Sequence, residues 1–347
     1  METQKAGNNM IKTAIVILNW NGIVYLKKFL GTIVKYSINP ETDIYVADNG
    51  SSDGSADWVE DNFKEVRLIR LARNYGFSEG YNRAIDQIDA EYYALINSDI
   101  EVTEGWLQPL VTFMDANRDT AACQPKILSY NRKDYFEHAG AAGGFIDIYG
   151  YPFCRGRILN ITEKDEGQYN DQADLFWSSG ACMIVRADTW KRCGGFDADF
   201  FAHMEEIDLC WRLNKAGFRT VYIPGSTVFH IGGGSLAYDS PFKIYLNFRN
   251  SLYMLYKNLP DDRLFYILFS RMILDGLAAL MFLIKGRPGY SKAVLKAHVS
   301  FYKSIGELRR KRKMVKKLGE DHSPGLILNK SIVFEFYVKG IKTYSRL

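Results

Sequence analysis

The chain has 347 residues, of which 47% are hydrophobic and 24% are charged, a balance typical of globular proteins rather than disordered or fibrous ones. This length is enough for one large domain with an appendage, or for two domains. The formal net charge is only +4, so the overall charge does not indicate a nucleic-acid-binding protein and we predict no nucleic-acid partner. The five cysteines are scattered without a Cys-x-x-Cys pair, which predicts free thiols in a reducing compartment.

Short β-rich runs alternate with helix-period segments in the first third of the chain. Strands are predicted at residues 13–18, 43–47, 66–71 and 92–96, and helices at residues 23–36, 55–63 and 78–88. This alternation predicts an α/β fold with a mostly parallel central sheet and helices on both faces. Ligands of such sheets bind beyond the carboxyl ends of the strands, where the polar segments of this chain also fall.

Polar side chains follow the first two predicted strands. Asn19 and Asn21 come after the first strand, and Asp48 and Asn49 come after the second. A carboxylate just past a strand can accept hydrogen bonds from the base or ribose of a nucleoside. The alternative is an Asx turn that caps the next helix through Asp53.

The fourth predicted strand delivers Asn97, Ser98 and Asp99 to the same edge of the sheet. An acidic residue in this place can hold Mg²⁺ or Mn²⁺, which prefer oxygen ligands and bridge to phosphates. A simple loop after a strand is the alternative, and an Asp-x-Asp pair would be a stronger sign of a metal site.

Acidic residues and a histidine mark the middle of the chain. Glu205, Glu206 and Asp208 open a helix predicted at residues 205–216, and at most one of them should face a site as a general base. The helix dipole alone would also favour these acids. His230 ends the second of two strands predicted at residues 219–223 and 227–230, where an imidazole can complete a divalent metal site or serve a structural role.

The last third predicts a helical extension. Residues 264–284 are apolar over a length sufficient to span a bilayer, but Arg271 and Asp275 interrupt them. We therefore expect a helix in the membrane interface, or packed on the protein, rather than a spanning one. The basic run at residues 307–317 is either a solvated helix face or a contact with anionic lipid head groups, and its apolar neighbour favours the lipid.

Seven segments in order resemble the family-2 glycosyltransferases with a GT-A fold, most of all the branch of rhamnosyl- and galactofuranosyltransferases. They are ILNWNG, VADNGSSDGS, ARNYGFSEGYNRAI, LINSD, SSGACMIVR, GGFDADFFAHMEEIDLCWRL and VFHIGGGS. The similarity covers about residues 12–255, and the ordered set is far more specific than any one motif.

The resemblance implies roles for the residues on the donor side. Asp48 matches the family's aspartate that contacts the nucleotide base, and Asn19 lies on the loop around the nucleoside. Arg73 matches a position near the base and the phosphates of the donor. Gly180 and Ala181 match a segment that lines the sugar.

The resemblance also implies a metal site and a base. Asp99 matches the metal-binding acid, His230 a histidine that joins the metal site, and Glu206 the catalytic base, with the other two acids of its helix as lesser candidates. Asn97 stands where many relatives have Asp, and Glu206 stands where Asp is commoner. These departures leave Asp99 as the main metal-binding acid and lengthen the arm of the base by one methylene.

The predicted organisation is a flexible extension (residues 1–11), a GT-A catalytic domain (12–239) and a helical, membrane-peripheral region (240–347). The implied reaction is an inverting, Mg²⁺- or Mn²⁺-dependent transfer of a sugar, with L-rhamnose the first expectation, from a dTDP- or UDP-linked donor. The acceptor is expected to be a lipid-linked or polysaccharide glycan of the cell surface, at the cytoplasmic face of a bacterial inner membrane.

Three other functions can be compared with the sequence. A nicotinamide-dependent dehydrogenase would need Gly-x-Gly-x-x-Gly after the first strand, where this chain has Asn-Trp-Asn-Gly. A processive polymerase would carry more spanning helices than this tail provides. A non-catalytic glycan-binding or scaffold protein on a transferase fold remains the main alternative.

Overall fold

The computed structural model describes residues 10–232, 240–320, 322 and 324–347. The predicted extension 1–11 lies outside these residues except for its last two, and the first strand begins at Ile11. The glycine run after His230 is described only as far as Gly232.

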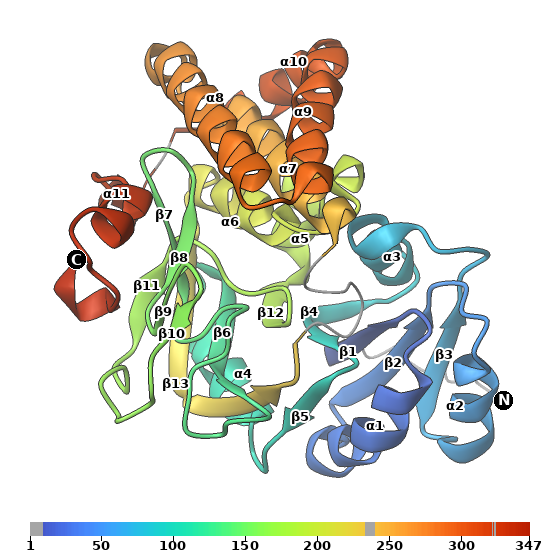
Figure 1. Cartoon of the computed structure of the whole chain (residues 1–347). Helices are drawn as coiled ribbons and strands as arrows, with labels where there is room; N and C mark the ends of the chain where they lie inside the picture. Colours follow the sequence, from blue (N-terminus) through green and yellow to red (C-terminus); the bar gives the residue numbers. More distant parts are fainter. Residues whose placement is uncertain (1–9, 233–239, 321, 323) are drawn as a thin grey trace, which may run out of the picture.

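A nine-stranded sheet forms the centre of the molecule (Figure 1). Its strands run in the order β11-β13-β6-β12-β4-β1-β2-β3, with β5 paired to β13. They are β1 (Ile11–Asn19), β2 (Thr42–Asp48), β3 (Val66–Arg70), β4 (Ala90–Asn97), β5 (Ile100–Val102), β6 (Thr120–Ser129), β11 (Ala173–Leu175), β12 (Cys182–Arg186) and β13 (Arg219–His230). Strands β1, β2, β3, β4, β6 and β13 point the same way, so the prediction of a mostly parallel sheet is confirmed.

The four strands predicted in the first third are all present, as are the three helices. One prediction in the middle differs, because the two strands expected at residues 219–223 and 227–230 are one continuous strand, β13. Its pairing with β6 shifts register between Ile223 and Thr227. Pro224 and Gly225 lie at this shift, and a proline without an N–H group is accommodated at such irregularities.

Each face of the sheet buries its own hydrophobic core. Along β1, Ala14 and Val16 belong to one core whereas Ile15 and Ile17 belong to the other, as the two-residue period of a strand requires. One face is covered by α1 (Ile23–Ser37), α2 (Ser55–Asn62) and α4 (Leu107–Ala116). The other face is covered by α3 (Gly76–Ile85), α5 (Ala187–Cys193), α6 (Glu205–Lys215) and α7 (Pro241–Asn258).

A smaller second sheet extends the middle of the chain. Its order is β10-β9-β8-β7-β14. The strands are β7 (Gly144–Asp147), β8 (Pro152–Cys154), β9 (Arg157–Ile158), β10 (Ile161–Thr162) and β14 (Ile327–Leu328). Strand β14 comes from the C-terminal region and pairs in parallel with β7, so that region is not purely helical. The chain ends beside this sheet after α11 (Ile332–Tyr337) (Figure 1).

The C-terminal helices stand together at one end of the molecule (Figure 1). They are α7, α8 (Asp261–Ile284), α9 (Pro288–Lys303) and α10 (Ile305–Lys316). Helix α7 contributes Leu252, Met254 and Leu255 to the same hydrophobic core as the sheet. Because of this shared core, α7 belongs to the same compact body as the central sheet and is not a detachable tail.

Candidate functional site

A cavity of about 590 Å³ opens at the carboxyl ends of β1 and β4, at the edge of the sheet where the polar segments were expected. It is lined by Leu18, Trp20, Asn49, Asn74, Gly76, Phe77, Asn97, Ser98, Asp99, His138, Ala139, Ser179, Gly180, Ala181, Phe201, Ala202, His203, Glu205, Glu206, His230, Phe242, Lys243 and Asn247. Nine residues predicted from the sequence therefore share one cavity. These are Asn49, Asn97, Ser98, Asp99, Gly180, Ala181, Glu205, Glu206 and His230.

The turns after β1 and β2 are tied to each other beside this cavity. Asn19 Nδ2 donates to Oδ1 of Asp48 at 3.2 Å and to Oγ of Ser55 at 2.8 Å. Asn21 accepts from the backbone N–H of Ser52 at 2.8 Å. Asn19, Asn21 and Asp48 thus form the frame of the turns rather than the cavity lining. Their predicted contact with the donor stays a prediction.

Asn49 connects this frame to the start of α3. Its Nδ2 donates to the carbonyl of Gly76 at 2.9 Å, and its Oδ1 accepts from the backbone N–H of Tyr75 at 3.0 Å. Arg73 is exposed, its guanidinium lies 5.0 Å from the centre of the Tyr75 ring, and it is absent from the cavity lining. Arg73 therefore lies outside the cavity, and its predicted contact with the donor stays a prediction.

Asp99 and His230 meet because the strands that follow and precede them are paired. Strand β5 starts one residue after Asp99 and pairs with the end of β13, placing His230 opposite Ile100. His230 Nε2 lies 3.1 Å from Oδ1 of Asp99, and its Nδ1 lies 3.1 Å from Oε2 of Glu137. The imidazole is thus held between two buried carboxylates.

The charges of Asp99, His230 and Glu137 stabilise one another. Burial opposes a charge on His230, but Asp99 and Glu137 outweigh it and raise the pKa of His230 to about 10. Burial likewise opposes ionisation of Asp99, and His230 overcomes it to hold the pKa of Asp99 below its usual range. Glu137 follows β6 in a segment without a recognisable motif, and the sequence analysis missed it.

Glu205 and Glu206 reach the cavity from the first turn of α6. Burial, and next the charge of Glu206, hold the pKa of Glu205 well above its usual range. Burial raises the pKa of Glu206 to about 7. One carboxyl oxygen of each is buried without a hydrogen-bond partner within the described chain. A Cβ added at Gly180 would lie 3.7 Å from Cβ of Glu206, so the glycine segment faces the acid closely.

The prediction of Asp208 as a candidate base is wrong in its geometry. Asp208 is fully buried and does not line the cavity. Its carboxylate accepts from Arg212 at 2.9 Å, from Lys257 at 3.0 Å and from Asn258 at 2.8 Å. These partners, two of them on α7, engage both oxygens of a carboxylate that lies outside the cavity, so Asp208 joins α6 to α7 and does not reach a substrate.

Several cavity residues were not singled out by the sequence. Phe77, Phe201 and Phe242 give the cavity an aromatic wall, and Lys243 and Asn247 reach it from α7. Phe242 comes from the segment assigned to the C-terminal region, so the site is completed by residues beyond the predicted boundary at 239. Outside a motif, the sequence does not distinguish an aromatic residue that lines a cavity from one that packs in the hydrophobic core.

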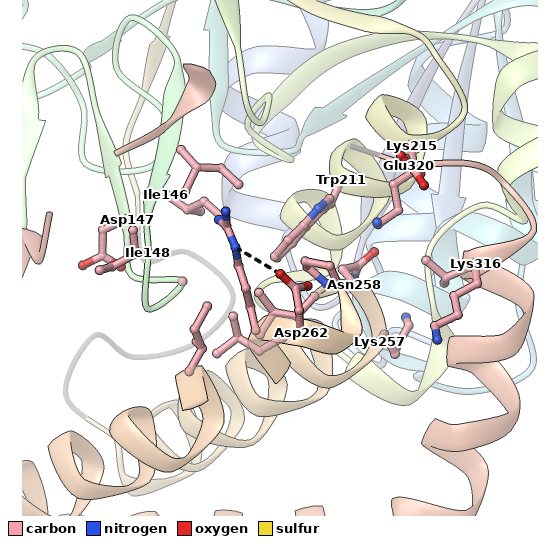
Figure 2. A pocket seen from close by; sticks show the side chains of 18 of the residues that line it. Ile146, Asp147, Ile148, Trp211, Lys215, Lys257, Asn258, Asp262, Lys316 and Glu320 are labelled. Carbon is pink, nitrogen blue, oxygen red and sulfur yellow. Dashed lines mark ion pairs between the residues drawn. The ribbon is translucent and has the colours of Figure 1, made fainter. Parts of the chain in front are cut away.

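A second, larger cavity of about 760 Å³ lies between the turn after β7 and the ends of α7, α8 and α10 (Figure 2). Four of its charged side chains already have ion-pair partners. Lys257 is paired with Asp197 and Asp208, Lys316 is paired with Asp261, and Asp262 lies 3.9 Å from Arg263. None of the predicted site residues lines it, so the cavity beside β1 and β4 is the candidate active site.

Comparison with known proteins decides the family. The sequence model described as glycosyl transferase family 2 matches residues 14–191, more than half of the chain. This chain belongs to glycosyl transferase family 2. It is a glycosyltransferase with a GT-A fold, as the resemblance predicted.

Two curated relatives and one solved structure are similar to this chain. The chain is 27% identical over 231 residues to an N-acetylglucosaminyl-diphospho-decaprenol L-rhamnosyltransferase of Mycobacterium tuberculosis, covering 62% of this chain and 75% of that protein. It is 27% identical over 164 residues to the rhamnosyltransferase WbbL of Escherichia coli, covering 45% and 61%. The crystal structure of GalNAc-T7 with UDP, GalNAc and Mn²⁺ superposes with a TM-score of 0.57 at 15% identity. That alignment covers 72% of this chain and 48% of the other, so this chain spans about half the length of that structure.

Proposed function

We propose that this family-2 glycosyltransferase transfers a sugar, with inversion, from a nucleoside-diphosphate donor to a hydroxyl of a lipid-linked acceptor. The two relatives named as rhamnosyltransferases support L-rhamnose as the sugar, and we expect its donor to be dTDP- or UDP-linked. One observation carries the proposal: the Glu206 carboxylate and the Asp99–His230 pair open onto the same cavity at the strand ends.

Glu206 is the proposed base. A general base must accept a proton near the working pH, and burial raises the pKa of Glu206 to about 7. Glu205 is 4% exposed, and burial and the charge of Glu206 hold its pKa well above its usual range, so we assign the base to Glu206 and not to Glu205. The unpartnered carboxyl oxygen of Glu206 is free to accept the proton of an acceptor hydroxyl as the glycosidic bond forms.

Asp99 and His230 suit a divalent cation. Asp99 Oδ1 and His230 Nε2, which share a hydrogen bond of 3.1 Å beside the cavity, would hold the cation, and its binding would displace the proton between them. Glu137 on the other ring nitrogen is the partner that metal-binding histidines usually have. When bound, the cation would offset charge on the diphosphate leaving group.

The remaining ligands would come from outside the protein. Among residues 10–232, 240–320, 322 and 324–347, no group of three or more Asp, Glu, His or Cys side chains is arranged to hold a cation. A site of two protein ligands that is completed by substrate phosphates and water is common for Mg²⁺. Metal and donor are therefore expected to bind together.

A donor panel tests the proposal. Purified protein is incubated with Mn²⁺ or Mg²⁺ and a set of nucleotide sugars, and release of nucleoside diphosphate is followed with and without chelator, beside the Asp99→Ala variant. Chelator-sensitive release from one donor that Asp99→Ala loses is the expected result. No release and no donor binding across the panel would contradict the proposal and favour a non-catalytic glycan-binding protein.

We also propose peripheral attachment to the cytoplasmic face of the inner membrane through α8. This is the one helix of the described chain long and apolar enough to cross a membrane, and only 28% of its apolar window is buried. Its bare face consists of Phe265, Tyr266, Phe269, Ile273, Leu277, Leu280, Met281, Leu283 and Ile284. Monomeric proteins rarely expose so large an apolar patch to water.

The two charges of α8 explain why it should lie on the membrane and not across it. Arg271 and Asp275 face the protein, where Arg271 Nε is 2.9 Å from Asp275 Oδ1 and donates from Nη1 to the carbonyl of Tyr149 at 3.1 Å. His298 on α9 lies 3.2 Å from the other oxygen of Asp275. Crossing the bilayer would break these contacts and leave the charges in lipid, at a cost of several kcal/mol.

The basic run contributes less than its sequence suggests. Lys311 is paired with Asp197 and Asp199, and Arg312 and Lys316 are paired with Asp261. Arg310 is paired with Glu307 of its own helix. Among the described residues, Arg309, Lys313 and Lys317 have no ion-pair partner and remain for lipid head groups. The apolar face of α8 is thus expected to dominate membrane binding.

Vesicle sedimentation tests this attachment. Phe265→Ser/Phe269→Ser should lower binding to vesicles of anionic lipid at least ~10-fold, since each phenylalanine contributes about 1.5–3 kcal/mol when fully buried. Phe334→Ser/Tyr337→Ser, which removes two exposed aromatics of α11, is the control and should bind as the unaltered chain does. Equal binding by all three proteins would rule out α8 as the contact. Truncation before α7 is unsuitable, because α7 belongs to the core.

A further inference from the structure

The segment directly before Glu205 and Glu206 has an unfavourable backbone. Phe201, His203 and Met204 have φ values of +63°, +71° and +72°. All three carry a Cβ, and the left-handed region is unfavourable for such residues. Residues held in this way persist only where the surroundings impose them, and they gather at functional sites.

Four consecutive carbonyls of this segment are bound by other parts of the chain. Asn250 Nδ2 lies 2.9 Å from the carbonyl of Phe200, 2.8 Å from that of Ala202 and 2.7 Å from that of His203. The carbonyl of Phe201 accepts from the backbone N–H of Phe77 at 2.6 Å and from that of Ser78 at 3.1 Å, at the start of α3. The two N–H groups of one side-chain amide on α7 are therefore shared among three of the four carbonyls.

The orientation of this amide is determined by Arg249. Arg249 Nε donates to Oδ1 of Asn250 at 2.9 Å, which turns Nδ2 toward the carbonyls. Arg249 Nη2 donates in turn to the carbonyls of Asp199 at 2.8 Å and Phe200 at 3.0 Å. Asn250 is fully buried, so no water competes for its donors. Arg249 and Asn250 therefore bind the backbone carbonyls of residues 199–203 and not the side chains of that segment.

Helix α6 depends on this support at its first turn. Its N-cap residue, Met204, makes no side-chain capping hydrogen bond. The direction in which α6 starts, and with it the direction of the Glu206 side chain, is therefore set by the segment that Asn250 holds. A shift of about 1 Å at a reacting group can cost ~100-fold in rate.

We propose that Asn250 is a positioning residue that holds residues 200–203 so that Glu206 points into the cavity. This inference rests on the proposed role of Glu206 as base. It assigns to α7, which lies beyond the segment matched by the family model, a part in the chemistry of the site. Asn250 acts through the backbone before Glu206 and does not line the cavity.

Asn258 provides a matched control two turns along the same helix. It is 1% exposed, against 0% for Asn250, and its Nδ2 donates to Asp208 at 2.8 Å and to the carbonyl of Met254 at 3.0 Å. Loss of this amide removes two buried hydrogen bonds, against the three carbonyl contacts and the Arg249 contact of Asn250, and it leaves residues 200–203 untouched. The two alanine variants therefore separate positioning from general destabilisation.

The experiment compares Asn250→Ala and Asn258→Ala in donor-dependent transfer, in thermal unfolding and in hydrogen exchange of peptides that contain residues 201–206. Asn250→Ala should lower kcat ~100-fold, leave the KM for the donor nearly unchanged, shift the pH–rate profile and speed exchange in those peptides. Asn258→Ala should unfold at a similar temperature while keeping kcat. Arg249→Met, which removes only the flanking donors, is measured in case Asn250→Ala does not fold, and its kcat should lie between.

Two outcomes would overturn the inference. If both alanine variants lose kcat equally at equal stability, the effect of Asn250 is structural. If Asn250→Ala and Arg249→Met keep the kcat and the exchange of the unaltered chain, the segment needs no support. Failure of the proposed function is distinct from both, since the unaltered chain would then transfer no sugar while faster exchange in Asn250→Ala alone would still support the positioning role.

Discussion

The two halves of the cavity are built in different ways. On the side proposed to bind the donor, polar residues lie at the ends of β1, β2 and β4, and their partners lie in neighbouring turns, as Asn19 with Asp48 and Asn49 with Tyr75 show. On the side of the proposed base, Glu206 follows a segment in an unfavourable conformation that a distant helix holds in place through Asn250. The first half depends on where strands end, and the second depends on contacts between segments about 50 residues apart.

This difference indicates which part of the site can change without disturbing the other. A turn after a strand keeps its place as long as the strand does, because the sheet fixes it. The first turn of α6 keeps its place only while α7 remains docked through the core and Asn250 holds the carbonyls of residues 200–203. Changes to the C-terminal region should therefore disturb the base before they disturb the donor turns.

The largest expected effect separates the two acids of the base half. Glu206→Gln should lower kcat by ~10²–10⁴-fold, the usual contribution of a general base, and leave donor affinity nearly unchanged. Glu205→Gln should have a much smaller effect, because burial and the charge of Glu206 hold the pKa of Glu205 well above its usual range. Steady-state kinetics and a calorimetric donor titration measure both. If Glu205→Gln is the inactive variant, the roles of the two acids are reversed.

Removal of Asp208, which joins α6 to α7 through Lys257, should have the next largest effect, on the free energy of unfolding. Asp208→Ala leaves the buried cations of Lys257 and Arg212 without this partner, and loss of one member of a buried charged group costs about 3–5 kcal/mol of unfolding free energy. Asp262→Ala is the control, because its pair with Arg263 is exposed and 3.9 Å apart. Denaturant unfolding measures both. Equal stability of the two variants would mean that the joint does not depend on charge.

Glu137 supports the Asp99–His230 pair from the second ring nitrogen of His230, and its removal should have an intermediate effect. Glu137→Gln keeps the shape of the side chain but removes the charge beside Nδ1, and such outer partners typically contribute 10–100-fold to metal affinity. Titration of Mn²⁺ in the presence of donor measures the change, with Glu101→Gln as a control at an exposed pair. An unchanged midpoint would show that Glu137 only fills space.

The two halves also differ in how far the sequence predicted them. The strand ends, the nine cavity residues and the meeting of Asp99 with His230 follow from alternating elements and an ordered set of motifs. Glu137 and Asn250 could not be found in this way, because a loop acid and a helix asparagine acquire their roles only from partners far along the chain. Asp208 was mistaken for a base for the same reason, since its partner Lys257 is 49 residues away.

The pH dependence gives the smallest and most diagnostic change. Burial raises the pKa of Glu206 to about 7, and only the ionised carboxylate can accept a proton, so transfer should fall as the pH drops through 7 and level off above about 8. Below the pKa, the rate should change about tenfold for each pH unit. Rates at saturating donor between pH 5.5 and 9 measure it, with donor binding followed in parallel. A flat profile at low pH with intact binding would mean that Glu206 titrates with an ordinary glutamate pKa and that the cavity is more open to water than its buried carboxyl oxygens indicate.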